Sequence, residues 1–181
     1  VIEEELDSVG LGLPPYHNGG ATHAAASILV WGTEEQKLHF LPPIIRGDAV
    51  LWQLLTEPSV GSDLASLQTN AIRDGDEYVI SGEKTFVGGA HGATWYWTIA
   101  RTDLNGKRHE NLSWFLISPD LPGISTAPME LLTTVTEDPG AATGIKHSVY
   151  FDNVRVPSFN LIGGENNGWK VASTPLESEH G

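Results

Sequence analysis

The stretch Trp52–Asp63, with the sequence WQLLTEPSVGSD, marks the point where the chain changes its character. It begins as an apolar run, breaks at Pro58 and turns through Gly61 into a polar end. A glycine lets a ligand approach the main chain, and backbone N–H groups beside hydroxyls such as Thr56 and Ser62 can hold phosphate oxygens. The same letters also fit a strand that runs into a polar turn, so two interpretations are open at this point.

The fifty residues before this stretch have helical patterns. Residues 1–10 have the apolar spacing of a helix's last turns, and residues 22–31 form an alanine-rich apolar helix. Thr33, with Gln36 three positions later, matches a capping box that begins another helix. That helix is predicted to end against the Pro-Pro pair that starts at Pro42, because proline lacks a backbone N–H.

After residue 51 the pattern changes to short, alternating segments rich in aromatic and β-branched residues. Asp74-Gly75 is a hairpin signal, and the polar residues 102–111 form a loop. The spacing predicts an antiparallel barrel or sandwich, with the Trp95–Trp97 run in its wall. The expected strands are residues 67–73, 78–80, 84–87, 95–101, 112–117 and 148–151.

The predicted fold class is therefore α+β: a helical segment, an antiparallel β-barrel or sandwich, and the start of a further helix. A Gly/Asn-rich turn leads into that helix at residues 169–179, where Pro175 is expected to cause a kink. We expect three parts: residues 1–51 end a helical domain, residues 52–157 form a β-domain, and residues 158–181 begin another helical domain. The chain starts without Met, which predicts a fragment of a longer protein.

Composition limits the possible functions. The 181 residues include 23 acidic and 10 basic side chains, for a formal net charge of −13. This balance argues against nucleic acid as a main partner, because phosphate binding needs clustered Lys and Arg. The chain has no cysteine, and its 7 scattered histidines form no metal-binding spacing with carboxylates, so no metal site is predicted. No membrane span or signal peptide is visible.

Three segments of the sequence form a set: TEPSVGSD at residues 56–63, SGEKTF at residues 81–86 and FDNVRVP at residues 151–157. Together they resemble the acyl-CoA dehydrogenase family. The first is similar to that family's flavin-binding signature, and the second is similar to its second flavin segment. The third resembles the exit from the family's middle β-domain. The order and spacing match, and the resemblance covers essentially the whole chain.

This resemblance implies FAD as the cofactor. Thr56 would bond the pyrimidine edge of the flavin, Phe86 would lie against its ring, and Ser62 would also contact the acyl-CoA. Without the resemblance, Phe86 would be interpreted as a core aromatic on a strand. The family usually has a Thr or Ser hydroxyl near flavin N5 where this chain has Gly88, so either the Gly88 N–H serves, or the redox tuning differs, or the protein is not a standard dehydrogenase. The implied cofactor-binding residues are Gln53, Leu55, Thr56, Gly61, Ser62, Phe86, Val87 and Gly88.

The implied reaction is α,β-dehydrogenation of an acyl-CoA thioester. A carboxylate removes the α-proton while the β-hydrogen leaves as hydride to the flavin. In most of the family that carboxylate lies in a C-terminal domain beyond this chain, and in a minority it lies where this chain has Glu179. Glu179 is thus the candidate base, and the alternative is a carboxylate that only favours the start of a helix.

The resemblance also implies partners: an acyl-CoA substrate, an electron-transfer flavoprotein or similar acceptor, and a homo- or hetero-oligomer. It implies a cytoplasmic location in a bacterium, or the mitochondrial matrix in a eukaryote. Two alternatives remain. One is an acyl-CoA oxidase or flavin-dependent hydroxylase of the same fold, and the other is a non-catalytic subunit or fragment that acts as a binding or structural partner.

Overall fold

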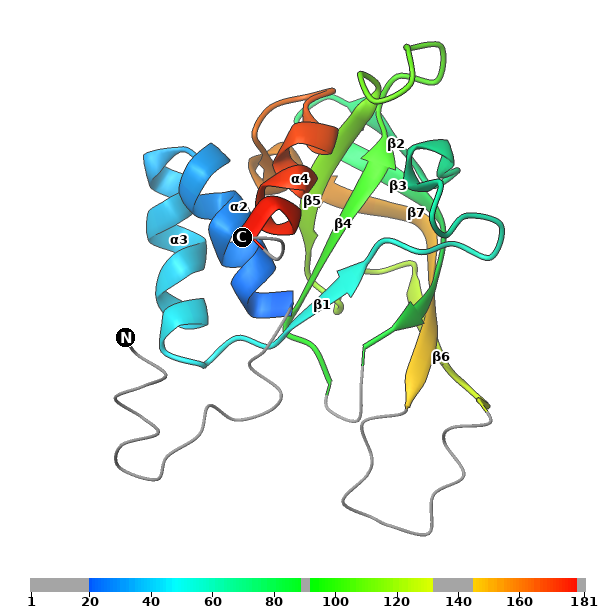
Figure 1. Cartoon of the computed structure of the whole chain (residues 1–181), viewed down its shortest axis with the longest axis horizontal. Coiled ribbons are helices and arrows are strands. Elements are labelled where there is room, and N and C mark those ends of the chain that lie inside the picture. The colour runs from blue at the N-terminus through cyan, green and yellow to red at the C-terminus, as the bar shows by residue number, and fades with distance from the viewer. Residues whose placement is uncertain (1–19, 89–91, 132–144, 179–181) are drawn as a thin grey trace, which may run out of the picture.

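The computed structural model describes residues 20–88, 92–131 and 145–178 (Figure 1). Helices α2 (Gly20–Trp31) and α3 (Glu34–Ile45) lie side by side next to a curved β-sheet, and α4 (Gly168–Ser178) packs against α2 (Figure 1). The helix predicted for residues 1–10 lies outside the described residues. The predicted order of helices, strands and a final helix is confirmed.

The two predicted helices near the start are present, and their capping box is formed. The Gln36 backbone N–H donates to Thr33 Oγ1 at 3.2 Å, and the Thr33 N–H donates to Gln36 Oε1 at 2.9 Å. The side chain of Gln36 also donates to the carbonyls of Phe159 and Leu161, at 2.7 and 2.9 Å. One buried residue therefore both begins α3 and ties it to the segment that leaves the sheet.

The predicted end of α3 before Pro42 is wrong, because the helix continues through Pro42 and Pro43 to Ile45. Both prolines lie in the last turn, where the fixed φ of proline is already helical and the missing N–H groups cost two hydrogen bonds at most. The carbonyls of the two prolines close the turn instead. They accept from the N–H groups of Arg46 at 3.1 Å and Asp48 at 2.9 Å.

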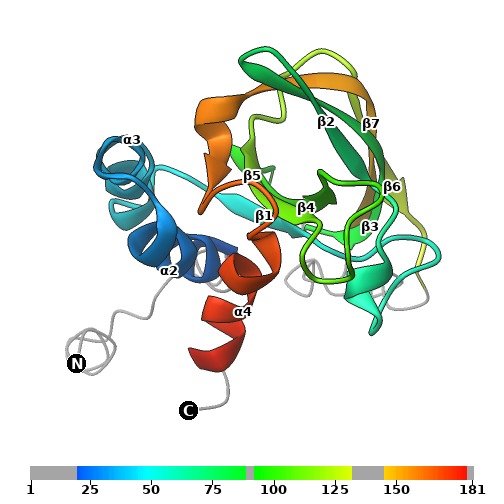
Figure 2. The same cartoon turned by 90° about the horizontal axis from the view of Figure 1, so that it is seen from above.

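The sheet has eight strands that curve around a common interior (Figure 2). Its order is β6-β7-β3-β2-β4-β5-β8, with β1 paired to β4. The pairs are antiparallel except for β1 with β4 and one residue pair of β2 with β4, so the predicted antiparallel sheet is confirmed with a parallel edge. The strands are β1 (Leu51–Leu54), β2 (Asn70–Asp74), β3 (Glu77–Val87), β4 (Trp95–Arg101), β5 (Leu112–Ile117), β6 (Ile124–Met129), β7 (Lys146–Pro157) and β8 (Leu161–Ile162).

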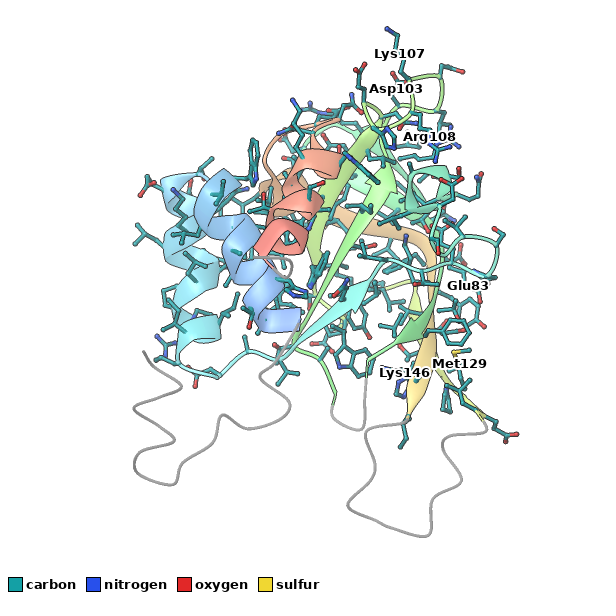
Figure 3. The ribbon with its side chains drawn as sticks, in the orientation of Figure 1. Glu83, Asp103, Lys107, Arg108, Met129 and Lys146 are labelled. Carbon is teal, nitrogen blue, oxygen red and sulfur yellow. The ribbon has the colours of Figure 1, made fainter. Side chains whose placement is uncertain are left out.

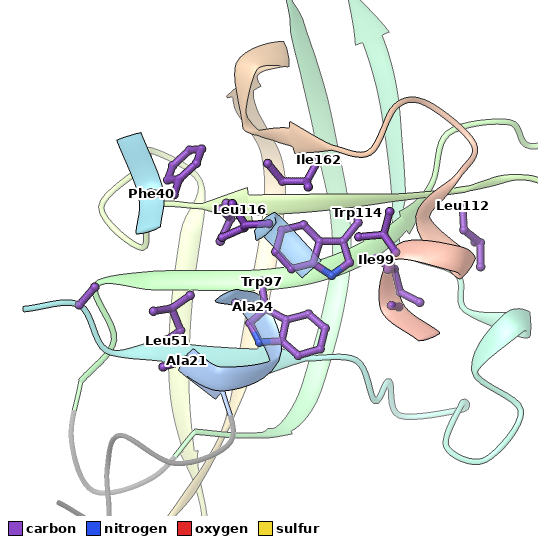
Figure 4. Packing of buried hydrophobic residues seen from close by; sticks show 14 of the residues in the cluster. Ala21, Ala24, Phe40, Leu51, Trp97, Ile99, Leu112, Trp114, Leu116 and Ile162 are labelled. Carbon is purple, nitrogen blue, oxygen red and sulfur yellow. The ribbon is translucent and has the colours of Figure 1, made fainter. Parts of the chain in front are cut away.

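Strand β4 separates two hydrophobic cores, because successive side chains point to opposite faces. Trp97 packs toward the helices, where its ring stacks on Trp114 of β5 with centroids 5.6 Å apart (Figure 4). Tyr96 faces the other core, inside the curved sheet. The prediction that the Trp95–Trp97 run forms the barrel wall is thus confirmed, since Tyr96 and Trp97 are buried.

The connection from the sheet to α4 is held by hydrogen bonds. Tyr78 donates its hydroxyl to Glu165 at 2.8 Å, and burial together with this carboxylate raises the pKa of Tyr78 to about 12. Gly168 starts α4 so close to β5 that a Cβ there would lie 2.5 Å from the carbonyl carbon of Ser113. The helix runs through residue 175. Within the described segments, no helix has the length and apolar character needed to cross a membrane.

Candidate functional site

The segment that follows β1 folds into a tight turn beside β3. Glu57 and Val60 exchange two backbone hydrogen bonds, at 2.9 and 3.0 Å, so Pro58 lies in the tip between them. One residue earlier, the carbonyl of Thr56 accepts from the Thr85 N–H at 2.9 Å. The two segments that sequence analysis connected with a flavin, around residues 56 and 86, are therefore neighbours in space.

Phe86 is not a core aromatic. Its side chain is 54% exposed, and its φ of 58° is in the left-handed region that aromatic residues rarely adopt. The pairing of β3 with β7 shifts between Lys84 and Val87, so Phe86 sits in a bulge. Such a backbone conformation costs about 1–3 kcal/mol and is found most often at functional sites. This bulge leaves the large ring of Phe86 on the surface.

Gly61 and Ser62 lie on the exposed side of the turn. A Cβ added to Gly61 would meet nothing within 4 Å, and Gly61 does not have a positive φ. Neither the packing nor the backbone conformation therefore requires glycine at this position. Open space over a glycine next to a hydroxyl fits the close approach of an anionic group to the main chain.

Three of the predicted cofactor residues turn their side chains inward. Gln53 is paired with His23 of α2 at 3.3 Å, Leu55 packs against the core below the helices, and Val87 is 1% exposed. The carbonyl of Leu55 also accepts from Lys84 Nζ at 3.2 Å. A ligand on the outer face would meet these residues through their main chain or their packing.

The side chain of Trp52 leaves room only for glycine at position 88. A Cβ at Gly88 would lie 2.5–2.7 Å from three atoms of the Trp52 indole, and the φ of Gly88 is 74°. The indole is held by stacking on His147 and on Tyr96, whose ring centroids lie 5.0 and 5.8 Å away. Lys146 Nζ donates to the Gly88 carbonyl at 2.9 Å. No hydroxyl-bearing side chain can therefore occupy position 88 while Trp52 keeps this place.

A buried ion pair lies directly behind the turn. Lys84 is fully buried, and its ammonium donates to Glu57 Oε1 at 2.9 Å and to the carbonyls of Leu55 and Ile99, each at 3.2 Å. Glu57 also accepts the backbone N–H groups of Gln68 at 2.6 Å and Thr69 at 3.0 Å. Every proton of the ammonium and both oxygens of the carboxylate thus have partners.

The pKa values of this pair follow from burial and mutual attraction. Burial raises the pKa of Glu57, but Lys84 and the two N–H donors outweigh it and bring that pKa below its ordinary value. Burial lowers the pKa of Lys84, and Glu57 opposes this shift. The charged form of each side chain therefore depends on the other.

The outer end of the turn carries a second, exposed ion pair. Asp63 pairs with Arg108 of the loop between β4 and β5, and both side chains are more than half exposed. Ser66 donates to Asp63 at 2.6 Å and, ahead of Arg108, lowers the pKa of that carboxyl. Figure 3 shows Arg108 with Lys107 and Asp103 at one end of the sheet, far from Lys146 at the other.

An open pocket of about 320 Å³ lies beside the turn. Thr56, Ser62 and Phe86, the side chains that the resemblance assigns to the flavin and the acyl-CoA, are not among its lining residues. Its walls come from the turn, from the start of β2 with the two residues before it, and from β3. They are formed by Glu57, Pro58, Ser59, Gln68, Thr69, Asn70, Ser81, Gly82 and Glu83.

Sequence reasoning missed Trp52 and the role of Lys84. Their partners Gly88 and Glu57 lie 36 and 27 positions away along the chain, and no local pattern relates such pairs. The candidate base Glu179 lies outside the described residues. Within the described ranges, no group of three or more His, Cys, Asp or Glu side chains is placed to hold a metal ion.

Comparison with known proteins identifies the family. The profile described as "Acyl-CoA dehydrogenase, middle domain" matches residues 53–154. The chain is 41% identical over 150 residues to acyl-CoA dehydrogenase FadE29 of Mycobacterium tuberculosis, covering 82% of this chain and 36% of that protein. It is 37% identical to FadE34 of the same organism, over 99% of this chain and 24% of that one. The chain belongs to the acyl-CoA dehydrogenase family.

Solved structures agree with this assignment. The structure titled "Tcur3481-Tcur3483 steroid ACAD" superposes with a TM-score of 0.80 at 35% identity, covering 98% of this chain and 43% of that one. An acyl-CoA dehydrogenase from Geobacillus kaustophilus gives a TM-score of 0.78 at 33% identity, over 98% and 45% of the two chains. The chain thus spans less than half the length of these relatives.

Proposed function

We propose that this chain supplies the FAD-binding face of an acyl-CoA dehydrogenase that carries out α,β-dehydrogenation of an acyl-CoA thioester. The observation that carries the proposal is Phe86, a half-exposed aromatic held with φ 58° next to Thr56. An exposed flat ring, a neighbouring hydroxyl and an open glycine suit a planar heterocycle with an anionic tail. In domain terms, residues 1–51 end a helical domain, 52–157 form the β-domain, and 158–181 begin another helical domain.

In this proposal each residue has a defined task. Thr56 orients the edge of the flavin, Phe86 covers its ring and excludes water, and Gly61 with Ser62 receives the pyrophosphate on backbone N–H groups and a hydroxyl. Gln53, Leu55, Val87 and Gly88 contribute main-chain or packing contacts. Ser62 also contacts the acyl-CoA. When bound, FAD accepts a hydride from the substrate.

The remaining chemistry is removal of the substrate's α-proton. Glu179 is the candidate base within this chain, and a residue beyond it is the alternative. A carboxylate base for this proton needs a dry surrounding that raises its pKa. A variant Glu179→Gln separates the two: it abolishes α-proton exchange if Glu179 is the base and leaves that exchange unchanged otherwise.

Partners follow from the same proposal. Two of the similar structures are titled as two-component proteins, the steroid ACAD and the ChsE4-ChsE5 complex from Mycobacterium tuberculosis. We therefore expect a homo- or hetero-oligomer, an electron-transfer flavoprotein or similar acceptor, and a cytoplasmic or mitochondrial-matrix location. Steroid-derived acyl-CoA thioesters belong in the substrate panel beside straight-chain and branched ones.

The test is flavin binding and turnover by the 181-residue chain. FAD is titrated against the chain by fluorescence quenching, and retained flavin is measured after gel filtration. We expect weak binding and no turnover with an artificial acceptor, because a half-enclosed cofactor site offers few contacts to offset the entropy of holding the ligand. Absence of any FAD binding by the unaltered chain contradicts the proposal. FAD binding by the unaltered chain that is lost in Phe86→Ala supports it.

A second candidate is a relative with different flavin chemistry, such as an acyl-CoA oxidase or a flavin-dependent hydroxylase. The contact of Gly88 with Trp52 favours it, because this contact excludes a side-chain hydroxyl at the position where the family usually has one. Photoreduced, flavin-loaded protein is mixed with oxygen, and its reoxidation is followed by absorbance. Fast reoxidation relative to free flavin supports the oxygen-reacting alternative, and slow reoxidation supports the dehydrogenase.

A further inference from the structure

We propose that Lys84 is a positioning residue, which holds Thr56 and Phe86 together as one site. The inference rests on the proposed flavin function and deepens it. Lys84 does not face the outer surface, since it is 0% exposed. It acts on the site through the backbone of the two segments that carry Thr56 and Phe86.

The first step is connectivity. The Lys84 ammonium bonds the carbonyl of Leu55 and the carboxylate of Glu57, so it binds the residues on both sides of Thr56. Its third bond goes to Ile99 of β4. Lys84 itself lies on β3, two residues before Phe86. A single charged group thus connects the Thr56 segment, the Phe86 strand and the neighbouring strand.

The second step concerns what the other contacts can do. Among the described residues, one backbone hydrogen bond joins these two segments: the Thr85 N–H donates to the Thr56 carbonyl at 2.9 Å. The antiparallel pairing of β3 is with β2 and β7, and its pairing with β7 shifts beyond Lys84. Phe86 therefore lies where strand pairing is interrupted, and side-chain anchors have to replace it.

The third step is energetic. A buried ammonium that loses one of its three acceptors cannot replace it with water, so the loss is costly in free energy. The positions of the three acceptors are therefore tightly constrained. A strained aromatic persists when its surroundings determine its conformation. Lys84 and the buried Val87 fix the strand on either side of Phe86. Removing the ammonium frees one of these two supports.

The test uses amide hydrogen exchange and FAD affinity of the 181-residue chain. In Lys84→Met, we expect the Thr85 amide to exchange about 100-fold faster relative to amides of β5, because its bond to Thr56 opens locally. FAD affinity is expected to fall by about tenfold or more. Asn160→Ala is the matched control: it removes a buried hydrogen bond to the Leu116 carbonyl, remote from the site.

Rescue separates positioning from a general effect on folding. The chain has no cysteine, so Lys84→Cys creates the single thiol of the protein. Alkylation of unfolded Lys84→Cys with 2-bromoethylamine restores an ammonium on a side chain of nearly the same length. After refolding, the protected Thr85 amide and the FAD affinity should both return. If Lys84→Met does not fold, Thr85 exchange and FAD affinity are compared between the unalkylated and alkylated forms of Lys84→Cys. The double variant Glu57→Gln/Lys84→Met, which removes both charges of the pair, gives a second comparison with the unaltered chain.

Two results would overturn the inference. One is an unchanged Thr85 amide in a folded Lys84 variant. The other is an FAD affinity that falls equally in Asn160→Ala at the same loss of stability. Failure of the proposed function looks different: the unaltered chain then binds no FAD, while the Thr85 amide still reports whether Lys84 holds the two segments together.

Discussion

The turn after β1 is fastened at both ends by an ion pair, and the two pairs have opposite surroundings. At the inner end, Glu57 and Lys84 are 4% and 0% exposed, and together they make four further hydrogen bonds with main-chain groups. At the outer end, Asp63 and Arg108 are 55% and 57% exposed. The same chemistry of carboxylate and cation therefore has different consequences at the two ends.

The difference shows that burial, more than charge, decides what an ion pair contributes. Water screens an exposed pair, and holding two long side chains in one geometry costs entropy, so exposed pairs contribute little. A buried pair has lost its water, so each partner depends on the other, and removal of one leaves a charge that nothing compensates. We expect the inner end to determine the structure of the turn and the outer end to adjust its surface charge.

The largest expected effect comes from breaking the inner pair. Glu57→Ala leaves the Lys84 ammonium and the N–H groups of Gln68 and Thr69 buried without their carboxylate, and should lower the unfolding free energy by about 3–5 kcal/mol. Urea denaturation followed by tryptophan fluorescence measures the change. Glu34→Ala, which breaks an exposed pair with Lys37, is the control and should change little. Equal effects of the two substitutions would contradict the comparison.

A somewhat smaller effect is expected where Gly88 meets the buried Trp52. Gly88→Thr adds a side chain against the indole and strains a backbone with φ 74°, which together should cost about 2–4 kcal/mol. Gly75→Thr separates these two causes, because Gly75 has φ 63° but open space around its Cβ position. Gly61→Thr, with neither cause, should be close to neutral.

Coupling gives the sharper form of this prediction. If the clash is the cause, Trp52→Ala combined with Gly88→Thr should cost less than the sum of the two single substitutions by about 1 kcal/mol or more. Additive values in this double-mutant cycle would mean that Trp52 does not determine the residue at position 88. The same double variant would also allow a hydroxyl at the position that the family usually gives to one.

The pH dependence of stability should be smaller but specific to the inner pair. Glu57 has a folded-state pKa below its ordinary value of 4.5, so its contribution is present above that value and is lost as the pH falls through the folded pKa. Glu57→Gln should therefore make the unfolding free energy fall less steeply below pH 4.5 than it does in the unaltered chain. Denaturant titrations at several acidic pH values measure both slopes, and parallel curves would contradict the assignment.

Much of the fold could be predicted from sequence because its signals are local. The capping box of Thr33 and Gln36, the alternation through Trp97 and the hairpin at Gly75 each involve neighbours along the chain. The helix through Pro42 was not predicted, because the compensating hydrogen bonds come from residues after the helix. Strand β6 was not predicted either, since its residues ISTAPM alternate weakly, none of them is buried, and they pair with β7 across a long connection.

The candidate site divides in the same way. Thr56, Ser62 and Phe86 could be chosen because the resemblance carries their motifs, and the structure places Phe86 on the surface. The burial of Lys84 could not be predicted, since a lysine between glycine and an aromatic gives no local sign that its partner is Glu57. Similarly, the space that forces glycine at position 88 is defined by a tryptophan on another strand.

The smallest expected effect concerns the outer end of the turn. Arg108→Ala removes the cation beside Asp63 but leaves the Ser66 hydroxyl that donates to the same carboxylate at 2.6 Å. Because both ionic side chains are mostly in water, the urea midpoint at moderate salt should stay within experimental error of the unaltered chain. Any shift should shrink further as NaCl is raised, whereas the effect of Glu57→Ala should hardly respond to salt, because the inner pair is shielded from ions. A large, salt-insensitive loss in Arg108→Ala would mean that the outer end, and not only the inner one, determines the structure of the turn.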